Sequence, residues 1–489
     1  MRKSSCAKQL LLASLLIGST SGVAQKLNLS QAVDYAKARN LNIQKSYSYQ
    51  EASREAKEGT ETYYLPTVSV YGGYTHLSDE LTLDLSQVQT SFVDGLSRQQ
   101  VSTLNTVSEE INGVPLTDQQ KIDIYNNSSN TLNALYPNFD ARLAYQDYFM
   151  ASVFVNQPIY LGGKLSNTHQ IEESNYRIAQ YSNLQAHDMV TRQTIEQYLT
   201  LLLLKQVVKT RESTYRGMVK HDSSTIRLVE AEIIPQFYEY GAQAAVAGSE
   251  SRWVTASNEY QAALNLFKNH LNMPLDTVID LSDSLYFVDF SFDVNEAQEA
   301  SIAYSPLIKI NEESQNIAES NISLARSEYL PDVFAVGEVQ LYQQNLPVIT
   351  PPWMVSLQLK WDIFNGGRDV NNVKAAKLFK EASKYDEELI SNELTTQVKN
   401  ANNRIETSKA VYVNQIKTRR LSQKNYHSIQ KQYAHGRVRS NEVIDARTLF
   451  EEAQLAELEA LYLYYLSVIE LHSLKGDLNT FVQIYEAAN

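Results

Sequence analysis

The sequence repeats itself, and this repeat constrains the fold more than any other feature. Leu29–Pro66 shares ordered landmarks with Val294–Pro331 at an offset of 265 residues, from Pro66 to Pro331. Pro158–Lys164 matches Asp362–Arg368 at an offset of 204, from Gly162 to Gly366. Several landmarks in one order at fixed offsets indicate two copies of one structural unit.

Each copy predicts the same order of elements: helix, strand, strand, long helix, helix. The first copy carries extra residues between its two strands, because the two offsets differ. The expected organisation is a first repeat at 25–273 with an insert at 76–147, a linker at 274–293, a second repeat at 294–476 and a tail at 477–489.

The fourth expected strand has the clearest alternation. Trp353, Val355, Leu357, Leu359 and Trp361 are apolar, and polar residues follow Met354 on the other parity. This period of two gives one apolar face, with aromatic residues at both ends as on strands that cross a bilayer. A soluble sandwich strand gives the same alternation, so both readings stay open for this segment alone.

The other strands alternate in the same way. They are expected to open at Pro66, to cover Tyr148–Val155 and to follow Pro331, and the fourth is expected to stop at Asn365. Small closed barrels need about eight strands or more. Four strands in one chain therefore require several copies to close a barrel.

The long helices predict a tube rather than a globular core. Leu165–Ala231 and Val370–Ala434 each have roughly 65 residues, or about 100 Å at 1.5 Å per residue. The helices that follow, to Leu271 and Leu474, are half as long, as is the single helix expected to end at Tyr63. Narrow apolar seams among polar residues are typical of coiled-coil packing with one side in water.

Local signals suggest where helices begin and turn. Ser30 is a candidate N-cap, and Asn295 with Gln298 resembles a capping box. The glycine pairs lack the third glycine and the Lys-Ser/Thr of a phosphate loop. We interpret them as strand-to-helix turns: Gly162, Gly163, Gly366 and Gly367.

Residues 1–24 have the pattern of a secretory signal peptide, with basic residues, an apolar run and a small-residue cleavage site. The single cysteine, Cys6, lies inside it, so no disulfide is expected. The formal net charge of −13 argues against nucleic acid as a partner. No later stretch reaches 18 consecutive apolar residues, so we expect strands rather than helices to span any membrane.

With these motifs in hand, the chain resembles the TolC-like family of outer-membrane efflux proteins from Leu27 to Gly476. The resemblance rests on Gln157–Gly163, Trp361–Arg368, Tyr433–Gly436 and Val443–Arg447. It implies an α+β membrane protein: a homotrimer with a 12-stranded β-barrel in the outer-membrane lipid and a 12-helix periplasmic α-barrel. It also implies a periplasmic adaptor (membrane fusion) protein and an inner-membrane transporter as partners. Separately, the eight His residues form no HExxH-type pair and the sequence has no GxGxxG or Walker motif, so we expect no cofactor, metal or enzymatic activity.

The resemblance points to a periplasmic gate on the helix after the second tip. The family has acidic rings there, and counting from Gly436 matches them to Glu442 and Asp445. These residues are three apart and share a helix face, so threefold symmetry would give two carboxylate rings that favour cations. The alternative is local: acidic residues in a first turn also offset the helix dipole.

Two helix tips are the expected adaptor-docking surface. The first departs from the family pattern, because it lacks the usual glycine. Whether Arg437 and Arg439 pair with a partner or stay solvated is left open. The tip residues are Glu232, Ile233, Ile234 and Pro235 in the first, and Gly436, Arg437, Val438, Arg439 and Ser440 in the second.

Two functions from different classes follow. One is an exit duct for small molecules or for type I protein secretion; the other is a non-conducting periplasmic coiled-coil scaffold. The strands with an apolar face and aromatic ends favour the duct. The insert is expected outside the cell, with a helix near Leu85–Val107, and its role is open.

Overall fold

The computed structural model describes residues 25–136, 140–344 and 351–488, so the expected signal peptide lies outside the described residues. The chain divides into two compact units. The sheet unit comprises residues 59–166 and 324–370. The helical unit comprises the residues before 59, residues 167–323 and the residues from 371 onward.

The sheet unit confirms the four predicted strands as one antiparallel sheet in the order β2-β5-β7-β8. The strands are β2 Thr67–His76, β5 Asp147–Leu161, β7 Asp332–Gln344 and β8 Trp353–Lys360. Since β5 lies between β2 and β7, it stays paired well past Val155 and ends where Leu161 meets Asp332.

The predicted end of the fourth strand at Asn365 is wrong, because β8 ends at Lys360. Lys360 pairs with Asp332, the first residue of β7, so the following residues have no strand to pair with. As the last strand of the sheet, β8 has a neighbour on one side only, and so does β2.

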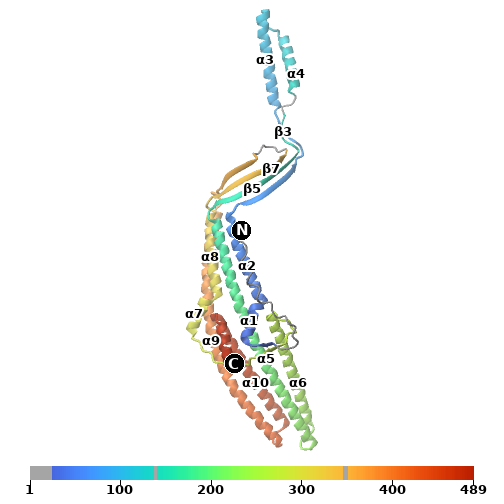
Figure 1. The fold of residues 1–489 in the computed structure, drawn as a ribbon, viewed down its shortest axis with the longest axis vertical. Coiled ribbons are helices and arrows are strands. Elements are labelled where there is room, and N and C mark those ends of the chain that lie inside the picture. The colour runs from blue at the N-terminus through green and yellow to red at the C-terminus, as the bar shows by residue number, and fades with distance from the viewer. Residues whose placement is uncertain (1–24, 137–139, 345–350, 489) are drawn as a thin grey trace. The chain divides into compact units, whose positions relative to one another are not determined.

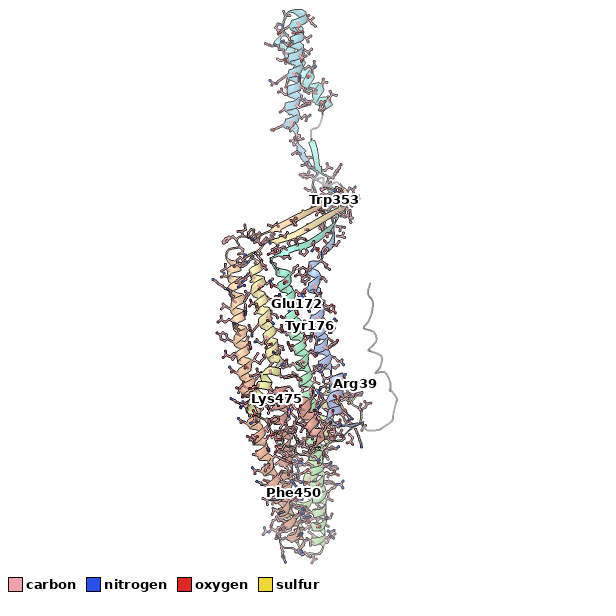
Figure 2. The ribbon with its side chains drawn as sticks, turned by 60° about the vertical axis from the view of Figure 1, so that its left-hand side comes forward. Arg39, Glu172, Tyr176, Trp353, Phe450 and Lys475 are labelled. Atoms are coloured by element: carbon pink, nitrogen blue, oxygen red, sulfur yellow. The ribbon has the colours of Figure 1, made fainter. Side chains whose placement is uncertain are left out.

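The alternating sequence of β8 gives its two faces different chemical character, one apolar and one mostly polar. Trp353, Val355, Leu357 and Leu359 share one face, and Leu357 exposes 72% of its surface. Figure 2 labels Trp353 at the start of this strand. A face of this kind lacks a covering layer within the chain.

The insert forms a helical hairpin on a two-stranded ribbon. β3 Leu81–Asp84 pairs with β4 Asp140–Ala144, and α3 Ser86–Asn112 lies beside α4 Asp118–Leu135 (Figure 1). The helix expected near Leu85–Val107 is confirmed in α3. The second helix of the hairpin has no counterpart among the predictions.

In the helical unit the long helices are confirmed. α5 Lys164–Glu230 and α9 Arg368–Ala434 have 67 residues each. They are followed by α6 Phe237–His270 and α10 Ser440–Lys475.

The single helix expected at the start of each copy is wrong, because each is two helices. α1 Leu29–Arg39 and α2 Leu41–Glu61 are separated at Asn40, and a 3₁₀ turn, Thr62–Tyr64, follows α2. α7 Val294–Tyr304 and α8 Pro306–Ser327 are separated at Ser305. Pro306 has no N–H to donate and pushes the preceding residue out of helical geometry, which explains the second break.

The proposed caps are also wrong. Asn28 caps α1, because its side chain accepts a hydrogen bond from the Gln31 amide at 2.8 Å. Asp293 caps α7 by accepting from the amides of Asn295 and Glu296. Each of these caps is the residue immediately before the first helical residue. From this position a side-chain oxygen can accept hydrogen bonds from the backbone amides of the first helical turn, which have no partner within the helix.

The linker is anchored to the helical unit. Its strand β6 Ile279–Leu281 pairs in parallel with β1 Gln25–Leu27. The buried hydroxyls of Tyr464 and Tyr465 on α10 donate to linker carbonyls of Val288 and Tyr286. These bonds satisfy the backbone of a segment that has little secondary structure of its own.

Residues after Gly476, expected only as a short tail, form α11 Leu478–Ala487. Phe481 and Tyr485 are fully buried. The Tyr485 hydroxyl donates to the Ser284 carbonyl at 3.0 Å. This helix therefore completes the main hydrophobic core around the linker.

Candidate functional site

Both tips turn through the same backbone motif. Gly436 has φ 67°, its amide donates to the Tyr433 carbonyl, and the Arg437 amide donates to Gln432. This pairing of bonds is a Schellman motif, which needs a left-handed residue.

At the first tip, Glu232 takes the place of that glycine with φ 53°. Its amide bonds to Val229, and the Ile233 amide bonds to Leu228. The first tip therefore has a different residue at the left-handed position but the same backbone turn as the second tip.

A small core fixes the second tip. Tyr426, Tyr433, Val443 and Phe450 are buried together, and Val438 packs against them. The Tyr433 hydroxyl lies 2.9 Å from the Thr225 hydroxyl on α5, and both are buried. The end of α9 is thus tied to α5 by this hydrogen bond, and the start of α10 packs on the same small core through Val443 and Phe450.

Ser440 differs from its neighbours at the tip. Its hydroxyl is buried and lies 2.8 Å from His221 Nε2, while Arg437 and Arg439 are exposed. Burial lowers the pKa of His221 to about 4, so the imidazole is neutral at pH 7. The Ser440 side chain therefore belongs to the packing of α10 and not to the exposed tip.

Further along α10, two buried charges tie this helix to α5. Arg447 donates to the hydroxyls of Ser213 and Thr214 at 3.1 and 3.2 Å. Burial lowers the pKa of Arg447, and its guanidinium lies over the ring of Tyr426. Glu451 is almost fully buried and forms an ion pair with Arg211 at 3.0 Å.

The two predicted gate residues are both exposed on α10. Glu442 accepts a hydrogen bond from the Arg439 amide at 3.3 Å, in the first turn of the helix. Asp445 lies beyond that turn and has no such role. Neither carboxylate forms an ion pair with any residue that the structure describes.

The exposed face of α10 carries more acid than was predicted. Glu452 and Glu459 are exposed seven and fourteen residues after Asp445. Steps of three and seven keep side chains on one side of a helix. The spacing of seven residues in the sequence could have predicted Glu452 and Glu459, but the resemblance to the family supplied only the positions of Glu442 and Asp445.

The four glycines lie in left-handed turns before α5 and α9, with φ between 59° and 87°. Gly162 is also confined, because a Cβ there would lie 2.9 Å from the Leu330 Cβ and from the Ser327 carbonyl. The turn of Gly162 and Gly163 follows β5 directly. Gly366 and Gly367 follow β8 after a five-residue gap.

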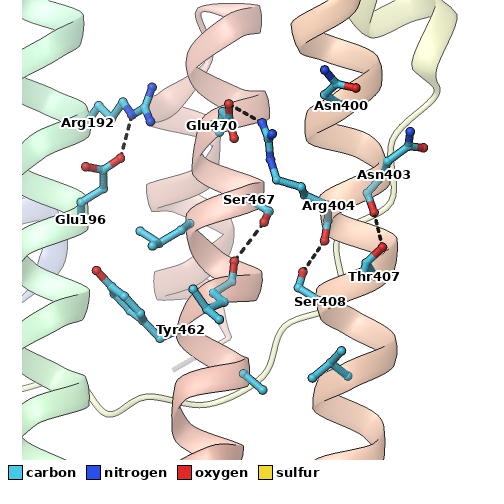
Figure 3. Close-up of a pocket in the computed structure, with 14 residues that line it drawn as sticks. Arg192, Glu196, Asn400, Asn403, Arg404, Thr407, Ser408, Tyr462, Ser467 and Glu470 are labelled. Atoms are coloured by element: carbon cyan, nitrogen blue, oxygen red, sulfur yellow. Dashed lines mark hydrogen bonds and ion pairs between the residues drawn. The ribbon is translucent and has the colours of Figure 1, made fainter.

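An open groove of about 880 Å³ lies between α5, α9 and α10 (Figure 3). Its charged side chains pair with one another: Arg404 with Glu470 at 2.5 Å and Arg192 with Glu196 at 2.7 Å. The remaining lining is mostly amide, hydroxyl and apolar. The groove offers polar contact surface but no arrangement of nucleophile and base.

Two searches within the described ranges are negative. No helix there is long and apolar enough to cross a membrane. No cluster of three or more His, Cys, Asp or Glu side chains there has a geometry suited to a metal ion.

Comparison with known proteins relates part of the chain to a protein family. Residues 299–477 match the model of a family described as outer membrane efflux protein. No curated protein gave a significant match.

Three solved structures are similar over most of their length. The CmeC outer membrane channel of Campylobacter jejuni has a TM-score of 0.69 at 14% identity, over 94% of this chain and 89% of that chain. The open MtrE outer membrane channel of Neisseria gonorrhoeae has 0.67 at 16%, over 92% and 89%. The outer membrane protein VceC of Vibrio cholerae has 0.66 at 11%, over 91% and 96%.

These findings confirm the resemblance to the TolC-like family. The chain has the fold of outer membrane efflux channels. Residues 299–477 carry the sequence pattern of outer membrane efflux proteins, and the shared fold extends over most of the chain.

Proposed function

We propose that three copies of this chain form an exit duct through the outer membrane and into the periplasm. Each copy contributes four strands to a 12-stranded barrel and its long helices to a 12-helix tunnel. A periplasmic adaptor and an inner-membrane transporter deliver small molecules or an unfolded protein to the tunnel.

The sheet carries this proposal. Its two edge strands, β2 and β8, each have one side without a strand partner in the chain, and β8 has an uncovered apolar face. Unpaired backbone groups and apolar side chains are both costly in water. Pairing β8 of one copy with β2 of the next satisfies the edges, and lipid covers the apolar face.

The helices also have faces that one copy leaves uncovered. On α9, Leu378, Tyr385 and Leu389 expose 65%, 59% and 65% of their surfaces, and their spacing of seven and four residues places them on one side of the helix. Large apolar side chains in such rows mark protein contacts. Neighbouring copies in a closed tunnel would cover them.

Within the duct, Asp445 is the stronger gate candidate and Glu442 the weaker. Glu442 is already engaged with the Arg439 amide, whereas Asp445 is exposed without a local role. Three Asp445 carboxylates around a symmetry axis would repel one another and attract cations.

The first tip suits an apolar contact with the adaptor. Ile233, Phe237 and Tyr240 expose 60–63% of their surfaces. At the second tip Arg437 and Arg439 are exposed, which suits acidic groups on the partner. An adaptor that reads both tips would therefore combine apolar and charged contacts.

Planar-bilayer conductance tests the duct and the gate together. We expect a small, cation-selective conductance that rises in the double variant Glu442→Ala, Asp445→Ala. The control is Glu250→Ala, which removes an exposed acid from α6 and should change nothing. An unchanged double variant would move the constriction elsewhere, and a folded, detergent-extracted oligomer without conductance would refute the duct.

A further inference from the structure

The helical hairpin of the insert carries a groove on one of its sides. The groove measures about 600 Å³ and lies between α3 and α4. Val101, Ile122 and Tyr125 give it an apolar lining, and Arg98 and Lys121 also line it. Both cations already pair within the hairpin, with Asp94 and Asp118, so the groove presents mainly apolar surface.

An apolar ridge runs along the other side of α3. Leu104, Val107 and Ile111 expose 39%, 41% and 76% of their surfaces. At about 100° per residue, Val107 lies roughly 160–180° around the helix from Asn105 and Arg98, which line the groove. A single hairpin therefore cannot place its own ridge in its own groove.

The hairpin buries little by itself. Among the described residues of α3 and α4, only Val93, Ser97 and Ser128 are buried. Polar contacts supply most of the seam, such as the Tyr125 hydroxyl donating to Asp94 at 2.6 Å and Ser128 donating to Gln100 at 2.7 Å. Helices of 27 and 18 residues need more apolar burial than this to persist in water.

We infer that the ridge of each hairpin packs into the groove of the hairpin from the next copy of the chain. A contact between two different surfaces of identical chains closes into a ring when the rotation permits it. The inference rests on the proposed trimer. Each insert connects β2 to β5, so a barrel of three copies would carry three hairpins at the same end of its strands.

Charge favours this occupant over a foreign acidic one. From Gln99 to Ser108 α3 carries no charged residue, so ridge and groove can meet without repulsion. Residues 76–147 contain ten Asp or Glu and three Lys or Arg. Anionic headgroups or acidic polymers would therefore be repelled by the rest of the insert.

Cross-linking of paired cysteines tests the contact. Cys6 is the only native cysteine, so Ser102→Cys in the groove and Val107→Cys on the ridge can be read cleanly in the full chain. With a short bismaleimide we expect most of the protein to run as covalent dimer and trimer, at least fivefold more than with either single variant. The matched control pairs Val107→Cys with Asn127→Cys, an exposed position on α4 that does not line the groove.

The mass of the detergent-solubilised protein, measured by light scattering, separates two kinds of failure. A trimer that forms no Ser102–Val107 cross-link would overturn the hairpin ring and leave the duct intact. Cross-linking by Val107→Cys alone would also overturn it, because the ridges would then meet one another. A folded monomer would refute the proposed trimer and the ring with it.

Discussion

Within the described ranges, five helix ends turn through a left-handed residue: Gly113 ends α3, and the other four form two equivalent pairs. Glu232 corresponds to Gly436, and Asn272 corresponds to Gly476, at the repeat offset of 204. Glycine enters this region without strain, whereas a residue with a Cβ pays about 1 kcal/mol. Gly476 has a second constraint, because a Cβ there would overlap the Tyr304 ring.

At the first tip, Glu232→Gly should therefore raise the free energy of unfolding by up to about 1 kcal/mol. The mirror variant Gly436→Glu should lower it by a similar amount. Thermal unfolding of the two variants beside the parent protein checks this. Equal shifts in the same direction would show that backbone strain does not govern these turns.

His221 predicts a pH dependence of stability. Burial lowers its folded pKa to about 4, against about 6.5 in an unfolded chain. Between pH 4 and 6.5, His221 is protonated in the unfolded chain but neutral in the folded protein. The free energy of unfolding therefore falls as pH drops from 6.5 toward 4. The full shift corresponds to about 3 kcal/mol.

We expect His221→Asn to flatten the dependence of the melting temperature on pH in this window. The exposed His427→Asn should leave the parent slope unchanged and so controls for the other histidines. A slope that is identical in all three proteins would mean that His221 is not the group responsible.

At the scale of elements, α11 is a structural helix and not an appendage. Phe481 is fully buried and stacks near Phe290 and Tyr485. Truncation of a buried Phe to Ala typically costs 3–5 kcal/mol. Phe481→Ala should lower the melting temperature strongly, while Thr480→Ala, on the exposed side of the same helix, should have little effect.

Two adjacent residues of β8 allow a test of its two faces, because neighbouring side chains in a strand point to opposite sides. Leu357→Arg places a charge on the apolar face, and Gln358→Arg places the same charge on the other face. A charge toward lipid costs roughly 2–4 kcal/mol near the bilayer centre. We expect only Leu357→Arg to reduce the yield of assembled protein in outer-membrane fractions; equal yields would argue against lipid contact on that face.

The whole molecule shows which features periodicity can predict. The 67-residue helices and the four strands follow from long apolar patterns and from landmarks that occur twice. The break at Asn40 and the burial of Ser440 do not, because each depends on packing between distant segments. The same holds for α11, whose ten residues gain their stability from the linker, and for α4, whose few apolar residues show no clear period.

The acidic stripe of α10 should also act on the assembled duct as a whole. Glu452 and Glu459 extend the stripe beyond the two gate positions, so we expect them to influence ion selectivity but not the closed constriction. Charge-based selectivity should be strong near 0.1 M salt and weak near 1 M, because the Debye length falls from about 10 Å to about 3 Å.

In a salt gradient, the double variant Glu452→Gln, Glu459→Gln should shift the reversal potential toward zero at low salt and leave the conductance of the closed channel unchanged. Glu250→Gln on α6 removes the same type of charge and should not shift it. If the double variant matched the parent protein at every salt concentration, the exposed face of α10 would not line the path of the ions. The acidic rings would then act only at Glu442 and Asp445, and the length of the tunnel would contribute nothing to selectivity.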